Sequence, residues 1–187
     1  MRRLLPFVLI VIVCGLLFTF ARGPEKGGKP APEFVLPDLQ GQVVRLSQLK
    51  GKIIMLNVWT TWCPPCRKEM PTMEKLHRRF QNSDFVLLAA SQDVDGKSTV
   101  LPYLREGGYT FPVVLDVNGE IGRKYGVTGY PETFIIDRRG RIVHHHIGYN
   151  DWSLPTVEAS LRRLLNQGDW VPWSDGQGAG EHSPLKQ

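Results

Sequence analysis

The feature that most constrains this fold is a pair of cysteines two residues apart, Cys63 and Cys66, between an apolar run and a helical pattern. Residues 53–59 are apolar except for one asparagine and predict a buried strand, and residues 64–80 predict a helix. The strand-to-helix turn places the first sulfur at the helix N-terminus, where free N–H groups and the helix dipole favour negative charge. Because a thiolate is the nucleophile of thiol–disulfide exchange, this position favours a redox-active pair.

Two alternatives compete with a redox-active pair. Half of a zinc site needs further ligands, but the only other cysteine, Cys14, lies in an apolar N-terminal run, where we interpret it as a small apolar residue. A static disulfide usually closes a longer loop and does not sit at a helix start beside a tryptophan. Arg67 follows Cys66 in place of the histidine of a haem-attachment motif. Spacing and context therefore favour redox chemistry with no metal.

The N-terminal segment predicts export from the cytoplasm. Arg2 and Arg3 precede the apolar run 4–21, which is longer than a typical signal core and just long enough to span a bilayer. An uncleaved anchor over residues 1–21 is therefore favoured over a cleaved signal, with the domain on the extracytoplasmic, periplasmic side of the cell membrane. A dithiol in that compartment is oxidised by default. Residues 22–29 form a Gly/Lys linker.

One domain is expected over residues 30–168, followed by a disordered tail, 169–187, rich in Gly, Ser and Pro. A β-hairpin, alternating strands and helices, a second hairpin and a last helix are predicted. Apart from the strand and helix that flank the cysteines, the predicted strands are 34–36, 43–46, 85–90, 111–115, 133–136 and 141–146. The other predicted helices are 98–106, 119–125 and one from residue 153 that ends at Gly168. The fold class is therefore α/β, with a central mixed sheet flanked by helices and an N-terminal β-hairpin extension.

Charge and histidine content add little to this interpretation. The net charge of +5 arises partly from the N-terminal arginines, and the other Lys and Arg residues are scattered, so we expect no nucleic-acid partner. The run His144-His145-His146 invites a metal interpretation. In a strand its outer two residues share one face and the middle one points the other way, and no carboxylate or cysteine cluster is near in sequence. We expect an edge or surface strand rather than a metal site.

A second informative segment, residues 127–134, contains Pro131 immediately before a predicted strand. With this proline, the chain resembles the thioredoxin superfamily. The other matching residues are Trp59, Trp62, Cys63, Pro65, Cys66 and Pro71. Segments 31–34, 62–69 and 129–137, with Asn57, narrow the resemblance to the membrane-anchored TlpA/ResA/CcmG group over about residues 30–167. The resemblance implies a thioredoxin-like fold in which Pro131 is cis and faces the cysteines.

The resemblance also implies roles for the cysteines and their neighbours. Cys63 is expected to be the exposed attacking thiol, and Cys66 the more buried thiol that resolves the mixed disulfide. Glu69 matches an acidic residue of the group thought to assist proton transfer, and a solvated glutamate serving the helix dipole is the alternative. Asn57 stands where thioredoxin has a buried acid, and because it cannot titrate, the acid–base role moves to Glu69.

The remaining candidate residues shape the site. Pro64 and Pro65 stiffen the ring between the cysteines and remove two N–H donors, so they are expected to tune the redox potential. The residues expected to contact substrate are Trp62, Pro64, Tyr130 and Pro131. Backbone beside a cis-proline can pair with an extended substrate strand. The residues expected to support the site are Asn57, Trp59, Pro65 and Pro71, the last of which should also kink its helix.

The function implied by the resemblance is that of an extracytoplasmic protein-disulfide reductase, a class with members in cytochrome c maturation. Such an enzyme uses no cofactor, is expected to be a monomer, and is re-reduced by a membrane electron donor of the thiol-transfer type. A thiol peroxidase is one alternative, but its motif needs a proline at the position of Leu56, and only Thr60 of that motif is present. A non-catalytic module that holds a partner at the cis-proline is the other, and the intact cysteine pair argues against it.

Overall fold

The computed structural model of the 187-residue chain describes residues 28–173. The predicted anchor, residues 1–21, and the tail beyond residue 173 lie outside the described residues. Within residues 28–173, no helix combines the length and the apolar character needed to cross a membrane.

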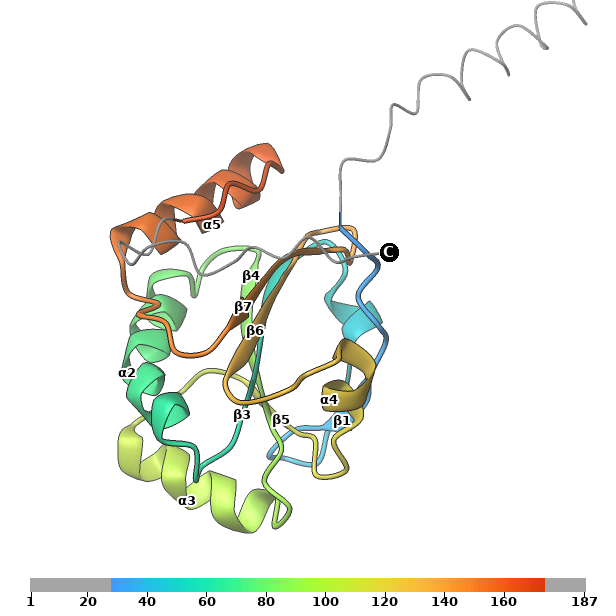
Figure 1. Ribbon diagram of the computed structural model, residues 1–187, viewed down its shortest axis with the longest axis vertical. Coiled ribbons are helices and arrows are strands. Elements are labelled where there is room, and N and C mark those ends of the chain that lie inside the picture. Colours follow the sequence, from blue (N-terminus) through green and yellow to red (C-terminus); the bar gives the residue numbers. More distant parts are fainter. Residues whose placement is uncertain (1–27, 174–187) are drawn as a thin grey trace, which may run out of the picture.

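A five-stranded mixed sheet forms the centre of the domain (Figure 1), with the strands in the order β5-β4-β3-β6-β7. β4 is parallel to both β3 and β5, whereas β6 is antiparallel to both β3 and β7. The strand bounds are β3 Ile53–Trp59, β4 Phe85–Ser91, β5 Val113–Leu115, β6 Glu132–Ile136 and β7 Ile142–Ile147. The predicted α/β class with a mixed sheet is confirmed, because the second hairpin adds its antiparallel strands at one side of the parallel ones.

Helices cover both faces of the sheet, with α2, α3 and α5 on one side and α4 on the other (Figure 1). Their bounds are α2 Pro64–Arg79, α3 Lys97–Gly107, α4 Glu120–Tyr125, α5 Pro155–Gln167 and the 3-10 helix η1 Leu46–Leu49. Pro71 lies on the exposed side of α2, and the helix continues through it to Arg79. The cysteine pair therefore lies on the helix that covers the centre of one sheet face.

The side chains of β3 alternate between two cores, as expected for a strand that is buried on both faces. Ile53, Met55 and Trp59 pack beneath α2, α3 and α5. Their neighbours Leu56 and Val58 pack on the opposite side with the N-terminal segment and α4. Because this strand is fully buried, the turn that follows it and carries the cysteines starts from a fixed position.

The expected N-terminal hairpin is present as β1, Val35–Pro37, and β2, Val43–Arg45. The chain enters the hairpin from the β7 edge of the sheet, where Pro30 bridges to Arg141, and directly after β1 it reaches the β5 edge, where Asp38 bridges to Val114. Phe34 is fully buried between these two points, on the face that α4 also covers. The hairpin therefore closes the core on the side opposite the cysteines.

The start of the C-terminal tail does not behave as its composition suggests. Disorder was expected from residue 169, and this is wrong for residues 169–173. Trp173 is 5% exposed and belongs to the core cluster on the α2 face, and Trp170 packs against the same cluster. The tail as a whole is rich in Gly, Ser and Pro, so its average composition does not reflect the large apolar area of these two tryptophans.

Candidate active site

Cys63 and Cys66 form a disulfide at the start of α2, with their Cα atoms 5.3 Å apart. Cys63 is the N-cap residue, and its Sγ accepts a hydrogen bond from the Cys66 N–H at 3.3 Å. Pro64 and Pro65 fill the first two helical positions and have no N–H, so the Cys66 N–H is the first donor that the helix offers to this sulfur. Negative charge that develops on Cys63 when the disulfide opens therefore meets one N–H donor and the positive end of the helix dipole.

The two cysteines differ in access, and the cis-proline faces the more accessible one. Cys63 retains 4% exposure, whereas Cys66 has none. The Tyr130–Pro131 bond is cis, as expected, and the Tyr130 carbonyl oxygen lies 3.5 Å from the Cys63 Sγ. In the disulfide this sulfur carries no proton, so the approach is a van der Waals contact. A reduced Cys63 thiol can donate to the same carbonyl oxygen.

Trp62 and Tyr130 form an aromatic rim beside the disulfide. Trp62 is 66% exposed, and its ring stands edge-on to that of Tyr130 with the centroids 5.7 Å apart. The Tyr130 hydroxyl donates to the Gln92 side-chain oxygen at 2.6 Å, and the Gln92 amide nitrogen donates to Asp116. Burial raises the pKa of Tyr130, and the nearby acids Asp116 and Asp93 add to the rise, so this hydroxyl stays a donor.

Asp93 fixes the turn that presents Trp62. Its carboxylate accepts hydrogen bonds from the Thr61 N–H and, at 2.6 Å, from the Thr61 hydroxyl. The Ser91 hydroxyl donates to the same carboxylate at 2.7 Å. Asp93 is 3% exposed, so water competes little for these bonds. The position of Trp62 is therefore set from the end of β4.

Glu69 lies one helical turn after Cys66 and is completely buried, which rules out a solvated glutamate. Its Oε1 accepts from the Asn57 side-chain amide at 2.8 Å, and its Oε2 accepts from the Trp152 indole N–H at 2.9 Å and the Asn150 N–H at 3.5 Å. Burial raises the pKa of Glu69 from 4.5 to about 7, although these three donors each lower it. Glu69 can therefore take up or release a proton near neutral pH.

Asn57 projects from the middle of β3 toward α2, where it holds the glutamate without titrating. Its side-chain nitrogen bonds both Glu69 and, at 2.9 Å, the Thr133 hydroxyl on β6. A second acid at this position would repel the Glu69 carboxylate, whereas the amide stabilises it. The structure therefore places Asn57 in contact with Glu69, the residue to which the sequence analysis assigned the acid–base role.

The histidine run lies on β7 at the edge of the sheet, as expected. His144 and His146 face Trp173 on the α2 side, while His145 bonds the buried Glu132 carboxylate at 2.7 Å on the other side. No three metal-ligating side chains gather within residues 28–173.

Sequence patterns did not reveal four residues that hold this site: Gln92, Asp93, Asn150 and Trp152. Each bonds a site residue that lies 32 to 83 positions away in the sequence, and none belongs to a motif with a fixed spacing. Only the predicted strand ends gave a signal for Gln92 and Asp93, because the carboxyl ends of neighbouring parallel strands meet at one edge of a sheet. Nothing in the sequence placed Trp152 beside Glu69.

A disulfide that opens a helix, a cis-proline that faces it, and this order of strands define a thiol–disulfide oxidoreductase of the thioredoxin-like class. Residues 27–145 match the AhpC/TSA family, so the chain belongs to that family. It is 37% identical over 149 residues to the thiol-disulfide oxidoreductase ResA of Bacillus thuringiensis subsp. konkukian, a match that covers 76% of this chain and 86% of that relative.

Solved structures agree with this assignment. A thiol:disulfide interchange protein of the thioredoxin family from Chlorobium tepidum TLS aligns with a TM-score of 0.60 at 28% identity, over 74% of this chain and 99% of that chain. StoA from Bacillus subtilis aligns with a TM-score of 0.58 at 26% identity, over 65% of this chain and 92% of that chain. The fold and the enzyme class are therefore those of a ResA-like thiol–disulfide oxidoreductase.

Proposed function

We propose that this enzyme reduces disulfides of partner proteins outside the cytoplasm through a mixed disulfide at Cys63. The main support for this proposal is the difference in solvent access between Cys63 and Cys66. Cys63 is the residue with exposed surface, caps the helix and faces the Tyr130 carbonyl, whereas Cys66 has no exposed surface. A partner sulfur can therefore approach Cys63, and Cys66 is left to attack the mixed disulfide from within.

The exchange takes place in two steps. The Cys63 thiolate attacks a substrate disulfide, so that one S–S bond forms to Cys63 and the other substrate sulfur leaves as a thiolate. The Cys66 thiolate then attacks the Cys63 sulfur, which releases the second substrate thiolate and closes the Cys63–Cys66 disulfide. Two electrons pass to the substrate, and the released thiolates take up protons. A dithiol donor in the membrane reverses these steps on the enzyme.

Glu69 is proposed as the group that exchanges protons with the pair. Cys66 must lose a proton before it can attack, and Glu69 is three residues along the same helix, on the same face. A buried carboxyl with a pKa of about 7 accepts and returns protons effectively near neutral pH. Asn57 and Trp152 hold the carboxyl in one orientation throughout the cycle.

The location and the substrate rest on the sequence. The apolar run 4–21 after Arg2 and Arg3 supports a membrane anchor with the domain on the periplasmic side. Resemblance to the ResA group supports apocytochrome c as a substrate whose disulfide is reduced before haem attachment. A thiol peroxidase is not favoured, because Leu56 in β3 stands where its motif needs a proline.

Trapping in the native membrane fraction tests the proposal. Cys66→Ser stops the cycle at the first step, so it should accumulate mixed disulfides with partner proteins that a reductant releases. Cys63→Ser is the matched control and should trap none. Reduced parent enzyme should also generate free thiols on disulfide-containing apocytochrome c. Equal trapping by both variants, or no thiols on a trapped partner, would contradict the proposal.

A further inference from the structure

The C-terminal segment 169–173 packs against a residue of the active site. After α5 the chain returns to the α2 side of the sheet, where Trp173 is nearly buried. The Trp173 ring meets the Trp152 ring edge to face at a centroid distance of 5.6 Å, and it lies 4.5 Å from His144. Trp152 is the residue whose indole N–H reaches Glu69.

Trp152 holds α2 at two points. Its indole N–H donates to the Glu69 carboxylate at 2.9 Å. Its backbone N–H donates to the Thr72 hydroxyl at 3.1 Å, and that hydroxyl donates to the Glu69 carbonyl oxygen at 2.7 Å. Both the side chain and the main chain of Glu69 are therefore connected to Trp152.

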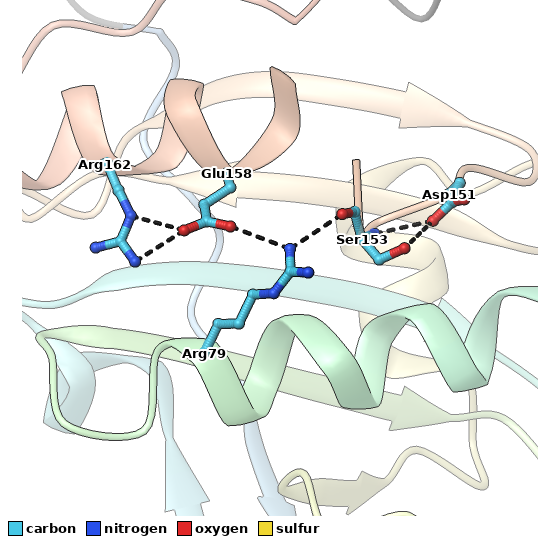
Figure 2. Close-up of polar contacts among 5 residues, drawn as sticks. All are labelled: Arg79, Asp151, Ser153, Glu158 and Arg162. Atoms are coloured by element: carbon cyan, nitrogen blue, oxygen red, sulfur yellow. Dashed lines mark hydrogen bonds and ion pairs between the residues drawn. The ribbon is translucent and has the colours of Figure 1, made fainter. Parts of the chain in front are cut away.

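The backbone on either side of Trp152 is fixed by polar contacts (Figure 2). The Asp151 carboxylate accepts from the N–H and the hydroxyl of Ser153. Arg79, near the end of α2, donates to the Ser153 carbonyl oxygen at 3.1 Å and to Glu158 on α5 at 3.0 Å. These contacts fix the backbone position of Trp152, but they do not contact its ring.

The Trp152 ring is held by other aromatic side chains. His146 meets it edge to face at 5.6 Å, as Trp173 does. Edge-to-face pairs stabilise the position of a ring beyond what the burial of its area contributes. Trp173 is the larger of the two neighbours, so its removal leaves the most room for the indole to turn away from Glu69.

We propose that Trp173 is a positioning residue for the exchange reaction, which holds the Trp152 indole on the Glu69 carboxyl and so makes the C-terminal segment part of the active site. The inference rests on the proposed acid–base role of Glu69. The titratable groups that surround the two tryptophans are His144 and His146 on β7 and Glu69 itself on α2. Any test by pH must separate the glutamate from these histidines.

The titration of Glu69 can be distinguished from that of the histidines through the indole N–H signal of Trp152 in a ¹H–¹⁵N spectrum of the oxidised full chain. Trp152→Phe identifies the signal. Ionisation of Glu69 should move it with a midpoint near 7, and Glu69→Gln should abolish that movement while any histidine-linked movement remains. Trp173→Ala should reduce the amplitude by at least about two-fold, because the hydrogen bond lengthens when the ring can turn.

Trp170→Ala is the matched control. Trp170 contacts Trp173 and His144 but is not paired with the Trp152 ring. The Trp170→Ala variant should therefore leave the amplitude of the Trp152 signal's movement as in the parent. If Trp173→Ala does not fold, as judged by circular dichroism, Trp173→Leu keeps the site apolar without a ring and should show the same loss. A full amplitude in a folded Trp173 variant, or a movement of the Trp152 signal that Glu69→Gln leaves at the parent's amplitude, would overturn the inference.

The same variants separate this inference from the proposed function. Alkylation of the reduced protein as a function of pH reports on the thiols alone. If Trp173→Ala weakens the indole signal's response but Glu69→Gln leaves the alkylation profile unchanged, Trp173 positions Glu69 and the proposed acid–base role is wrong. If Glu69→Gln shifts that profile while Trp173→Ala leaves both readouts unchanged, only the inference about Trp173 fails.

Discussion

Two buried glutamates on α2, Glu69 and Glu74, are held in opposite ways. Glu69 accepts hydrogen bonds from neutral donors only, and burial raises its pKa to about 7. Burial acts on Glu74 in the same direction, but the Thr110 N–H, the Arg78 side chain and the Thr110 hydroxyl outweigh it, so the pKa of Glu74 is lowered. Burial alone therefore does not make a carboxyl a proton carrier.

The two pKa values differ because the two halves of α2 face different surroundings. The first half of α2 covers the middle of the sheet, where Asn57 and Trp152 offer hydrogen bonds without charge. Glu74 faces the loop that leads to β5, and it ties the Thr110 backbone to α2. The first arrangement keeps a carboxyl ready to change protonation near neutral pH, while the second keeps one ionised and structural.

The largest expected effect is on the reaction rate of Glu69→Gln. The amide keeps the shape and most hydrogen bonds of the carboxyl but cannot carry a proton. We expect disulfide reduction at neutral pH to slow by about 10²-fold, the lower end of the range for general acid–base groups. The pH profile of thiol alkylation should shift as well, because coupled groups titrate together. Glu74→Gln is the control and should change neither quantity.

The two glutamates should also have opposite effects on stability as the pH changes. Below pH 4.5 Glu69 is protonated in both the folded and the unfolded states and costs nothing. As the pH rises from 4.5 to 7 the unfolded state ionises first, so stability falls, by about 3 kcal/mol once the pH exceeds 7. Urea unfolding of the oxidised chain should therefore show Glu69→Gln gaining stability over the parent between pH 5 and pH 8. A constant difference would contradict the raised pKa.

Glu74→Gln should destabilise the fold without touching the chemistry. It removes the ion pair to Arg78 and leaves a Thr110 donor badly matched, which should cost about 1–3 kcal/mol at neutral pH. Because the pKa of Glu74 is lowered, its contribution is present above pH 4.5 and is lost as the pH falls through the folded value. Urea unfolding at pH 7 and pH 3 checks this: a loss that persists unchanged at pH 3 would assign the effect to packing.

The smallest expected effect is that of Arg79→Gln. Arg79 is exposed, and its contacts to Ser153 and Glu158 hold the loop before α5 from outside (Figure 2). Ion pairs at the surface contribute little, so we expect a loss of about 0.5 kcal/mol, made smaller by salt. Reduction kinetics should match the parent. A clear loss of activity would mean that the loop depends on this contact to keep Trp152 on Glu69.

The sequence predicted those parts of the site that are local along the chain. Cys63, Cys66 and Glu69 are positioned by the spacing of one helix, and Pro131 by its place before a strand, so periodicity and resemblance were sufficient. The partners of Glu69 could not be predicted, because a hydrogen bond such as that of Trp152 depends on how α5 and its preceding loop pack on α2. The burial of Trp173 was missed for the same reason.

The most direct test of the account is the titration of the Glu69 carboxyl itself. With ¹³C-labelled glutamate in the full chain, and Glu69→Gln to assign the signal, the carboxyl carbon of the oxidised protein should titrate with a midpoint near 7. In the reduced protein the curve should change shape, because the thiols of Cys63 and Cys66 then titrate with it. A midpoint near 4.5, the same in both redox states, would contradict the proposed role of Glu69 in the exchange.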